Sequence, residues 1–246
     1  MSRDLVVDRL ERERAFHDDR FSEETRAATD KYYVAAGSSD EDYHRALEVE
    51  PGTRVLEYGC GTGSAAPALA ARGARVVGID LSGVAVAQAQ SDADDDGSRF
   101  IQMNAEELAF GDGFFDVVCG SGILHHLDLD RAFAEVRRVL RPGGQAVFVE
   151  PLGHNPLINA YRRATPNLRT DDEHPLLMGD IDRARRYFTS VDVSHHALFS
   201  LATAPLSGTL LGRRAVPRVN ALDQWIFRSV PALRRYSWIV VLRFSA

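Results

Sequence analysis

Short apolar runs alternate with longer segments of helical spacing between residues 51 and 150. β-Branched and aromatic residues dominate the short runs, which is typical of buried strands, and Ala, Leu, Gln, Glu and Arg dominate the segments between them, which favours helices. Alternation of this kind predicts a parallel, doubly wound sheet with helices on both faces. We expect strands at 54–57, 75–79, 99–103, 115–119 and 145–150, and helices at 65–72, 84–90 and 131–140.

Less regular sequence flanks this alternating part on both sides. Residues 1–50 are charged with scattered apolar positions, which predicts N-terminal helices that cap the core. A segment rich in Pro, Arg and His follows at 150–176, and two more strands are expected at 191–198 and 236–244. Because 246 residues fit one α/β unit, we expect a single domain over 1–246. Its parts are a helical cap (1–50), a core (51–151) and a part with an insertion and the last strands (152–246).

The composition excludes several classes of protein. Hydrophobic residues make up 45% and charged residues 26% of the chain, as in soluble globular proteins. No stretch approaches the ~20 apolar residues that cross a bilayer, and the charged first residues differ from a signal peptide, so we expect no membrane span and a cytoplasmic location. Cys60 and Cys119 have neither disulfide nor zinc-site spacing and are expected to be reduced core thiols.

Charge is distributed unevenly along the chain. The net charge is −6, but residues 1–150 hold 16 basic and 28 acidic side chains, a balance of −12, whereas residues 151–246 hold 13 basic and 7 acidic, a balance of +6. The basic second part fits an anionic substrate, a nucleic acid or a membrane surface. A solvated face explains it equally simply.

The glycine-rich sequence at 59–63 carries the strongest chemical signal. A strand ending at Tyr58 runs into Gly-Cys-Gly-Thr-Gly and then into a helix, so the backbone can approach a ligand beside the free N–H groups of a helix N-terminus. A carboxylate, Asp80, ends the next expected strand in the sequence VVGIDLS. Rossmann dehydrogenases use GxGxxG, whereas Ser64 stands at the third glycine position here. A tight turn without a ligand is the alternative interpretation.

These two motifs resemble the class I, Rossmann-like S-adenosylmethionine-dependent methyltransferases of the small-molecule type. The resemblance implies a seven-stranded, mostly parallel sheet whose last strand is antiparallel. It also implies that Glu57 helps to hold the methionine portion of the cofactor and that Asp80 accepts hydrogen bonds from both ribose hydroxyls. Asn104 would meet the adenine amino group, and Gly120 and Ser121 would lie beside the methionine carboxylate and amine.

The expected cofactor site includes neighbours of these residues. Glu106 fits a helix start equally well, and Tyr33 fits core packing as well as contact with the cofactor. The expected cofactor-binding residues are Tyr33, Glu57, Gly59, Cys60, Gly61, Gly63, Asp80, Leu81, Asn104, Ala105, Glu106, Gly120 and Ser121.

Two histidines and a carboxylate are the candidates for catalysis. His125 and His126 follow the fourth expected strand and Glu150 ends the fifth, so all three should meet at the carboxyl edge of the sheet, where such folds bind ligands. If the acceptor is a hydroxyl, either histidine could remove its proton while Glu150 holds the other imidazole nitrogen. A histidine that packs or caps the next helix is the alternative.

The segment after Glu150 is the expected lid over the acceptor, because loops after strand ends carry specificity on this scaffold. Arginine forks bind carboxylate or phosphate, which fits an anionic acceptor, but Arg169 also fits an ion-pair cluster with Asp171, Asp172 and Glu173. The candidate substrate-binding residues are His154, Asn155, Tyr161, Arg162, Arg169 and His174.

Three functions fit these observations. The first is methyl transfer to a small molecule, at oxygen or nitrogen, with carbon open. The second is methylation of nucleic acid or protein, but GSGI stands where many such enzymes have an NPPY-type motif, and we expect no nucleic-acid partner. The third is a non-catalytic cofactor-binding module. Neighbouring His195 and His196 on a strand point to opposite faces, so we expect no metal site, and apolar 222–230 and 238–244 fit a core or a homodimer surface.

Overall fold

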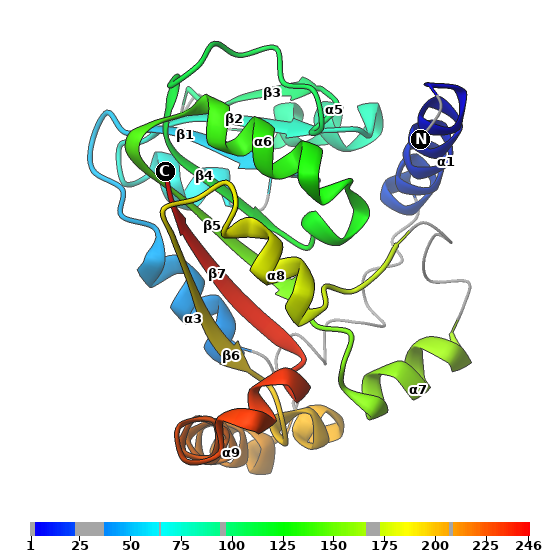
Figure 1. Ribbon diagram of the computed structural model, residues 1–246, viewed down its shortest axis with the longest axis vertical. Coiled ribbons are helices and arrows are strands. Elements are labelled where there is room, and N and C mark those ends of the chain that lie inside the picture. The colour runs from blue at the N-terminus through cyan, green and yellow to red at the C-terminus, as the bar shows by residue number, and fades with distance from the viewer. Residues whose placement is uncertain (1–2, 23–36, 64, 94–96, 166–172, 207–208) are drawn as a thin grey trace.

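A computed structural model describes residues 3–22, 37–63, 65–93, 97–165, 173–206 and 209–246 (Figure 1). Its centre is a seven-stranded sheet in the order β3-β2-β1-β4-β5-β7-β6. The first five strands pair in parallel, and β7 is antiparallel to both β5 and β6, which confirms the predicted sheet and its antiparallel last strand. The strands are β1 (Arg54–Tyr58), β2 (Arg75–Asp80), β3 (Arg99–Gln102), β4 (Phe115–Ser121), β5 (Leu140–Pro151), β6 (Ser190–His196) and β7 (Ile239–Ser245).

Helices cover both faces of the sheet (Figure 1). Successive strand residues point to opposite faces, so Val147 of β5 packs with the residues of α3 and α4, and Phe148 packs with those of α6 and α8. Burial on both faces explains why the strands are continuous apolar runs. The α-helices are α1 (Arg3–Ser22), α3 (Gly37–Ala46), α4 (Ala66–Ala70), α5 (Gly83–Asp92), α6 (Leu129–Val139), α7 (Pro156–Ala164), α8 (Met178–Ala184) and α9 (Leu210–Ser229), and the short 3-10 helices are η2 (Leu124–His126), η4 (Ser200–Leu206) and η5 (Pro231–Tyr236).

The start of β5 differs from the prediction. The sequence predicts this strand at 145–150, but the strand begins at Leu140 and contains the Pro-Gly-Gly of residues 142–144. The pairing of β4 with β5 shifts between Phe115 and Val117, so the extra residues form an irregularity in the ladder. Proline has no N–H to donate, and such an irregularity is one of the few places in a sheet that tolerates it.

Helix α9 is longer than the helical stretch expected at 222–230, and most of its apolar side chains are not core. Trp225 is 60% exposed and Leu222 is 48% exposed, whereas Phe227 is buried. The core interpretation of this segment is therefore wrong for most of its large apolar residues. Among the described residues, no helix combines the length and the apolar character that a membrane crossing requires.

Candidate active site

The turn after β1 depends on glycine. Gly59 and Gly61 have φ of +70° and +52°, a region that favours glycine. A Cβ atom on Gly59 would lie 2.7 Å from the side chain of Ile123, so close packing also excludes a larger residue. Glu57 anchors the turn from inside, because its carboxylate accepts hydrogen bonds of 2.8 and 3.1 Å from two consecutive N–H groups at the N-terminus of α4.

Asp80 ends β2 directly beside this turn. Its Oδ2 accepts a hydrogen bond of 2.8 Å from the N–H of Gly61, and its Oδ1 accepts one of 2.8 Å from the N–H of Ser82. The carboxylate is thereby fixed in place before any ligand binds. Each carboxylate oxygen has a second lone pair, so the group retains the capacity to accept hydrogen bonds from ligand hydroxyls.

A cavity of about 780 Å³ runs along the carboxyl ends of the parallel strands. Its wall continues from the glycine turn past the ends of β2, β3 and β4 to the end of β5. The side-chain oxygen of Asn104 accepts a hydrogen bond of 2.9 Å from the N–H of Glu106, which leaves the amide NH₂ and one oxygen lone pair for a ligand. Predicted cofactor residues on the wall are Gly59, Cys60, Gly61, Asp80, Leu81, Asn104, Ala105 and Ser121.

Four other predicted cofactor residues lie behind this wall instead of on it. Glu57 anchors α4, and Glu106 is buried in an ion pair with Arg131 at 3.4 Å. Gly63 and Gly120 allow close packing, since a Cβ atom on Gly120 would lie 2.6 Å from a backbone oxygen of β1. In this structure these four residues shape the site from behind its wall. Tyr33 lies outside the described residues.

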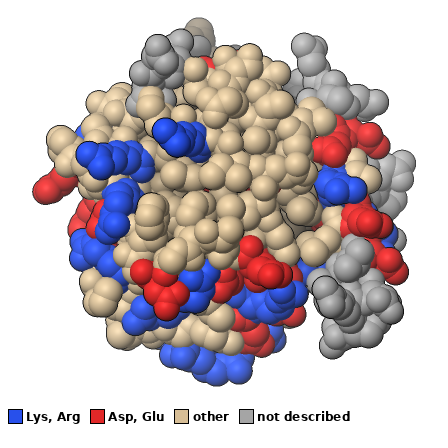
Figure 2. All heavy atoms as spheres, turned by 90° about the horizontal axis from the view of Figure 1, so that it is seen from above, with Lys and Arg blue, Asp and Glu red and all other residues tan. Residues whose placement is uncertain are grey.

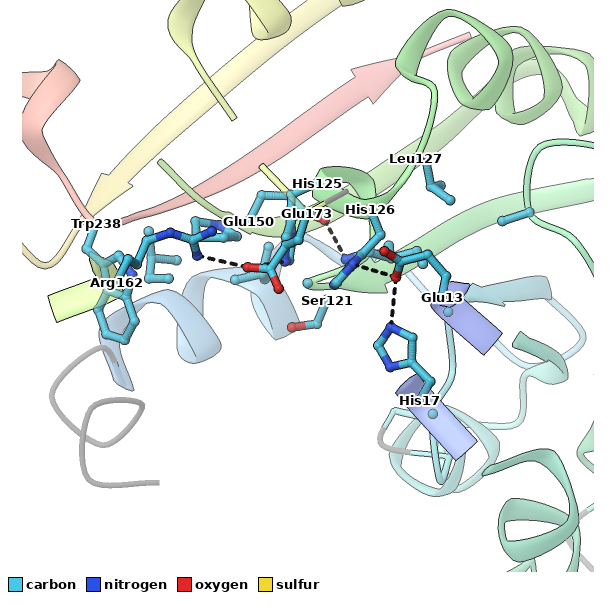
Figure 3. Close-up of a pocket in the computed structure, with 18 of the residues that line it drawn as sticks. Glu13, His17, Ser121, His125, His126, Leu127, Glu150, Arg162, Glu173 and Trp238 are labelled. Atoms are coloured by element: carbon cyan, nitrogen blue, oxygen red, sulfur yellow. Dashed lines mark hydrogen bonds and ion pairs between the residues drawn. The ribbon is translucent and has the colours of Figure 1, made fainter. Parts of the chain in front are cut away.

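His125 and Glu150 form a buried pair in the middle of the cavity (Figure 3). Nδ1 of His125 lies 2.7 Å from Oε2 of Glu150. The other oxygen of this fully buried carboxylate accepts hydrogen bonds of 2.9 and 2.7 Å from the N–H groups of Ile123 and Leu124. On the opposite side of the ring, Nε2 of His125 lies 3.9 Å from Oε1 of Glu173.

His126 faces a different part of the molecule from His125. Its ring lies 4.2 Å from the His125 ring, centroid to centroid, but its Nδ1 points to Oε2 of Glu13 on α1, 3.2 Å away (Figure 3). The structure therefore separates the two histidines that the sequence left equivalent, and only His125 pairs with Glu150.

The far end of the cavity is mostly apolar. Tyr161 and Arg162 of α7 line it as predicted, but Nη1 of Arg162 lies 2.8 Å from Oε1 of Glu173, so this fork is engaged by a carboxylate of the protein. Burial raises the pKa of Glu173, but the charges of His125 and His126 and the Arg162 contact outweigh burial and lower it. The apolar residues at this end are Leu157, Ile158, Leu198, Phe199, Leu201, Ala202, Trp238 and Ile239.

The other predicted substrate residues do not line the cavity. Asn155 caps α7 through a hydrogen bond of 3.0 Å from the N–H of Leu157, and His154 accepts one of 3.2 Å from the N–H at the start of α8. Burial, with the charge of Arg235, lowers the pKa of His154. His174 is exposed and contributes its backbone N–H to the carbonyl of His125. Arg169 lies outside the described residues.

Several cavity residues were not predicted. Glu13 and His17 come from α1, whose charged sequence suggested only a cap, and Trp238 was assigned to core or a dimer surface. Glu173 was recognised as an ion-pair partner, but for Arg169. A regular spacing that would place these residues at the cavity is absent from the sequence, because each reaches it through the tertiary fold.

Two further predictions, on the cysteines and on the His195–His196 pair, can be compared directly with the structure. Cys60 and Cys119 are buried free thiols, and burial raises the pKa of both. His195 and His196 point to opposite faces of β6 as expected: the first contacts Ser237 and the second contacts Asp42, each at 3.1 Å.

Surface charges are mixed on the face of the molecule shown in Figure 2. Acidic and basic side chains lie close together around a broad area without charge. Several Lys or Arg side chains gather at the upper left of this view, and acidic and basic side chains are mixed along its lower and right sides.

Known proteins match the central part of this chain, which runs from β1 to β5. Residues 56–148 match the family model of a methyltransferase domain. An uncharacterised methyltransferase of Synechocystis is 39% identical over 107 residues, which cover 42% of this chain and 50% of the relative. The demethylmenaquinone methyltransferase of Clavibacter sepedonicus is 38% identical over 108 residues, 43% of this chain and 44% of the relative. The chain thus spans about half the length of these relatives.

A solved structure extends the likeness beyond the matched segment. The phosphoethanolamine N-methyltransferase 2 of Haemonchus contortus, in complex with S-adenosyl-L-methionine, superposes with a TM-score of 0.60 at 18% identity, over 85% of this chain and 52% of that one. At this identity the likeness shows the fold. Residues 56–148 of this chain are therefore similar to a methyltransferase domain, and most of the chain shares the fold of this neighbour.

Proposed function

We propose that the protein transfers a methyl group from S-adenosylmethionine to an apolar small molecule that carries an ionisable hydroxyl group. One observation carries this proposal: a single cavity joins an end formed by strand termini to an apolar end, and the His125–Glu150 pair lies between them.

The residues of the first end fit the cofactor. Gly59 and Gly61 line the cavity without side chains, and the fixed carboxylate of Asp80 suits two ribose hydroxyls. Leu81 and Met103 offer apolar surface to a flat adenine ring. When bound, this cofactor supplies an electrophilic methyl group on a positively charged sulfur. The protein therefore has mainly to position the acceptor and receive its proton.

His125 is the group best placed to receive that proton. A carboxylate only accepts hydrogen bonds, so Nδ1 of His125 donates to Glu150, and the unprotonated Nε2 is the ring atom that would receive a proton. For an acceptor methylated on oxygen, Nε2 of His125 would receive the hydroxyl proton as the oxygen takes the methyl group that a bound cofactor would supply. For methylation at a ring carbon, Nε2 would hold the hydroxyl proton and return it to the oxygen after the methylated carbon has lost its own proton to solvent.

The apolar end of the cavity supports an apolar acceptor over an anionic one. Arg162, the predicted anion ligand, already contacts Glu173 at 2.8 Å, and the added negative charge of Glu173 disfavours a carboxylate or phosphate nearby. Trp238, Phe199 and Leu157 provide aromatic and aliphatic surface instead. A relative named as a demethylmenaquinone methyltransferase supports an acceptor of this chemical type.

A transfer assay with matched acceptors tests this function. The purified full chain is incubated with S-adenosylmethionine labelled in its methyl group and with three hydroxylated aromatic compounds: the bare ring, the ring with an alkyl chain, and the ring with a carboxylate. We expect label in the alkylated compound above all. Cofactor binding without transfer to any apolar compound would contradict the acceptor class, and absence of cofactor binding would contradict the whole proposal.

A further inference from the structure

Three potential metal ligands meet where α1 crosses the edge of the cavity (Figure 3). Oε2 of Glu13 lies 3.2 Å from Nδ1 of His126 and 3.4 Å from Nε2 of His17. Glu13 and His17 are spaced i, i+4 on α1 and so share one face of the helix, while His126 comes from η2. All three residues line the cavity.

The cluster is largely buried, and one of its ring nitrogens, Nδ1 of His126, is unsatisfied in the part of the chain that the structure describes. Side-chain exposure is 5% for Glu13, 9% for His126 and 20% for His17. Nδ1 of His126 is buried and makes no hydrogen bond within the described residues, although a carboxylate oxygen lies 3.2 Å away. A buried ring nitrogen without a hydrogen bond lowers the stability of the folded protein. An ion bound between this nitrogen and the Glu13 oxygen would remove that loss.

The spacing of the three ligand atoms suits a small divalent cation. Tetrahedral sites have metal–ligand bonds of roughly 2.0–2.1 Å, which places ligand atoms roughly 3.3 Å apart. The two contacts of Glu13, at 3.2 and 3.4 Å, agree with that separation, and all three ligand atoms lie within 4.8 Å of one another. Two imidazoles and one carboxylate favour zinc and related transition metals, because Mg²⁺ and Ca²⁺ prefer oxygen ligands.

We propose that Glu13, His17 and His126 bind a divalent transition-metal ion, with zinc the best match, at the edge of the cavity. Three protein ligands leave a fourth position of a tetrahedral site for a further ligand. Because all three residues line the cavity, that position is accessible to an oxygen atom of a bound small molecule. The site goes beyond the methyl-transfer proposal, which needs none of these three side chains.

A second group of potential ligands shares His126 but fits less well. His125, His126 and Glu173 also have ligand atoms within 4.8 Å of one another. However, Nδ1 of His125 already contacts Glu150 at 2.7 Å, and Oε1 of Glu173 contacts Arg162 at 2.8 Å. The first group combines a helical i, i+4 pair with a third ligand from η2, and the Glu13 oxygen lies at 3.2 and 3.4 Å from the two ring nitrogens, so we assign the ion to it.

Metal binding would also fix α1 to the core. Arg9 forms an ion pair with Glu106, and Asp18 accepts a hydrogen bond from the hydroxyl of Ser82, so polar contacts flank the cluster on both sides. A metal ion bound to Glu13, His17 and His126 would add coordination bonds between α1 and η2, in the middle of the contact between α1 and the rest of the protein. We therefore expect zinc to stabilise the packing of α1 on the protein.

Metal titration of the full chain tests this site without an activity assay. The protein is stripped with a chelator and titrated with Co²⁺, whose visible absorption reports tetrahedral coordination, and then with Zn²⁺ in competition. We expect one equivalent to bind and Zn²⁺ to raise the melting temperature of the protein. His17→Ala and Glu13→Gln should each weaken binding at least about 100-fold, because each of only three ligands carries a comparable share of the affinity.

His44→Ala is the matched control variant. His44 forms a solvent-exposed i, i+4 pair with Asp40 on α3, at 3.7 Å, and should have no effect on metal affinity. Circular dichroism of each variant checks that it is folded. Failure of the unmodified protein to bind an equivalent of either metal would overturn the proposal, as would undiminished binding by folded His17→Ala and Glu13→Gln.

Discussion

The two ends of the cavity are constructed in different ways. The cofactor end is formed by chain segments that directly follow β1, β2, β3 and β4, and backbone hydrogen bonds to Asp80 and Glu57 hold it in shape. The acceptor end consists of side chains from α7, from residues 198–202 and from the start of β7, with few polar contacts. A rigid backbone site suits one fixed ligand, whereas an apolar side-chain surface can change without disturbing the sheet.

The largest expected effect is on turnover, and it comes from replacing His125, which lies between the two ends. His125→Ala should lower turnover by about 10² to 10⁴-fold, the usual range for a lost general base, with little change in cofactor affinity. Labelled methyl transfer and calorimetric titration with the cofactor measure the two quantities. His174→Ala is the control, since this side chain is exposed. Turnover of His125→Ala within a few-fold of the unmodified protein would remove the base from the mechanism.

The free energy of unfolding should depend on pH through His195, which contacts Ser237, the residue before Trp238 of the acceptor end. Burial, with the charges of Arg234 and His196, lowers the pKa of His195 to about 4 from 6.5. Between these values the unfolded chain binds a proton at this residue and the folded chain does not, so stability falls as the pH decreases from 6.5 to 4. The loss is up to about 3 kcal/mol in the free energy of unfolding.

Urea unfolding at several pH values measures this loss. His195→Gln should give a shallower decline over the same pH range, and His174→Gln, the exposed control, should follow the unmodified protein. Equal slopes for His195→Gln and the unmodified protein would show that His195 does not hold its neutral form in the folded state.

A smaller effect concerns the cofactor end. Asp80→Asn should weaken cofactor binding by about 10- to 100-fold, because hydrogen bonds to a charged group contribute about 1.5–3 kcal/mol each. Calorimetry measures the affinity, and Asp192→Asn on the exposed side of β6 is the control. Unchanged affinity in folded Asp80→Asn would place the ribose elsewhere.

The smallest effect tests the apolar surface. Trp238→Ala should raise the KM for the acceptor about tenfold and leave cofactor affinity unchanged, since a single lost aromatic contact in a binding surface costs about 1–2 kcal/mol. The control is the other tryptophan of the chain, Trp225, which is 60% exposed on α9 and does not line the cavity. If Trp225→Ala raised KM as much as Trp238→Ala did, the acceptor would bind outside the cavity.

The same contrast explains what the sequence could predict. The strands of the core and the residues at 59–61, 80–81 and 104–105 follow from local patterns, because each strand end is marked by its own apolar run and the residues after it. A motif does not distinguish a residue on a wall from one behind it, so the sequence includes Glu57, Gly63 and Gly120 in the site without showing that they are packed behind the wall. Their burial and close packing became evident only in three dimensions.

The acceptor end could not be predicted in this way. His154 and Asn155 were chosen for their chemistry, but the first contacts the start of α8 and the second caps α7. Glu13 reaches His126 from more than a hundred positions earlier in the chain, and no local periodicity encodes such a contact. Contacts of this range depend on how α1 and α7 pack, and packing is decided by the whole fold.

The reversed direction of β7 affects how the acceptor end of the cavity can change between related proteins. β6 ends and β7 begins at the same edge of the sheet, and the N–H of Trp238 bonds to the carbonyls of His196 at 3.1 Å and Ala197 at 2.9 Å. The segment between the two strands therefore leaves the sheet and returns to it at neighbouring positions. Exchange of residues 198–237 between homologues would change the acceptor end, while the parallel strands keep their register.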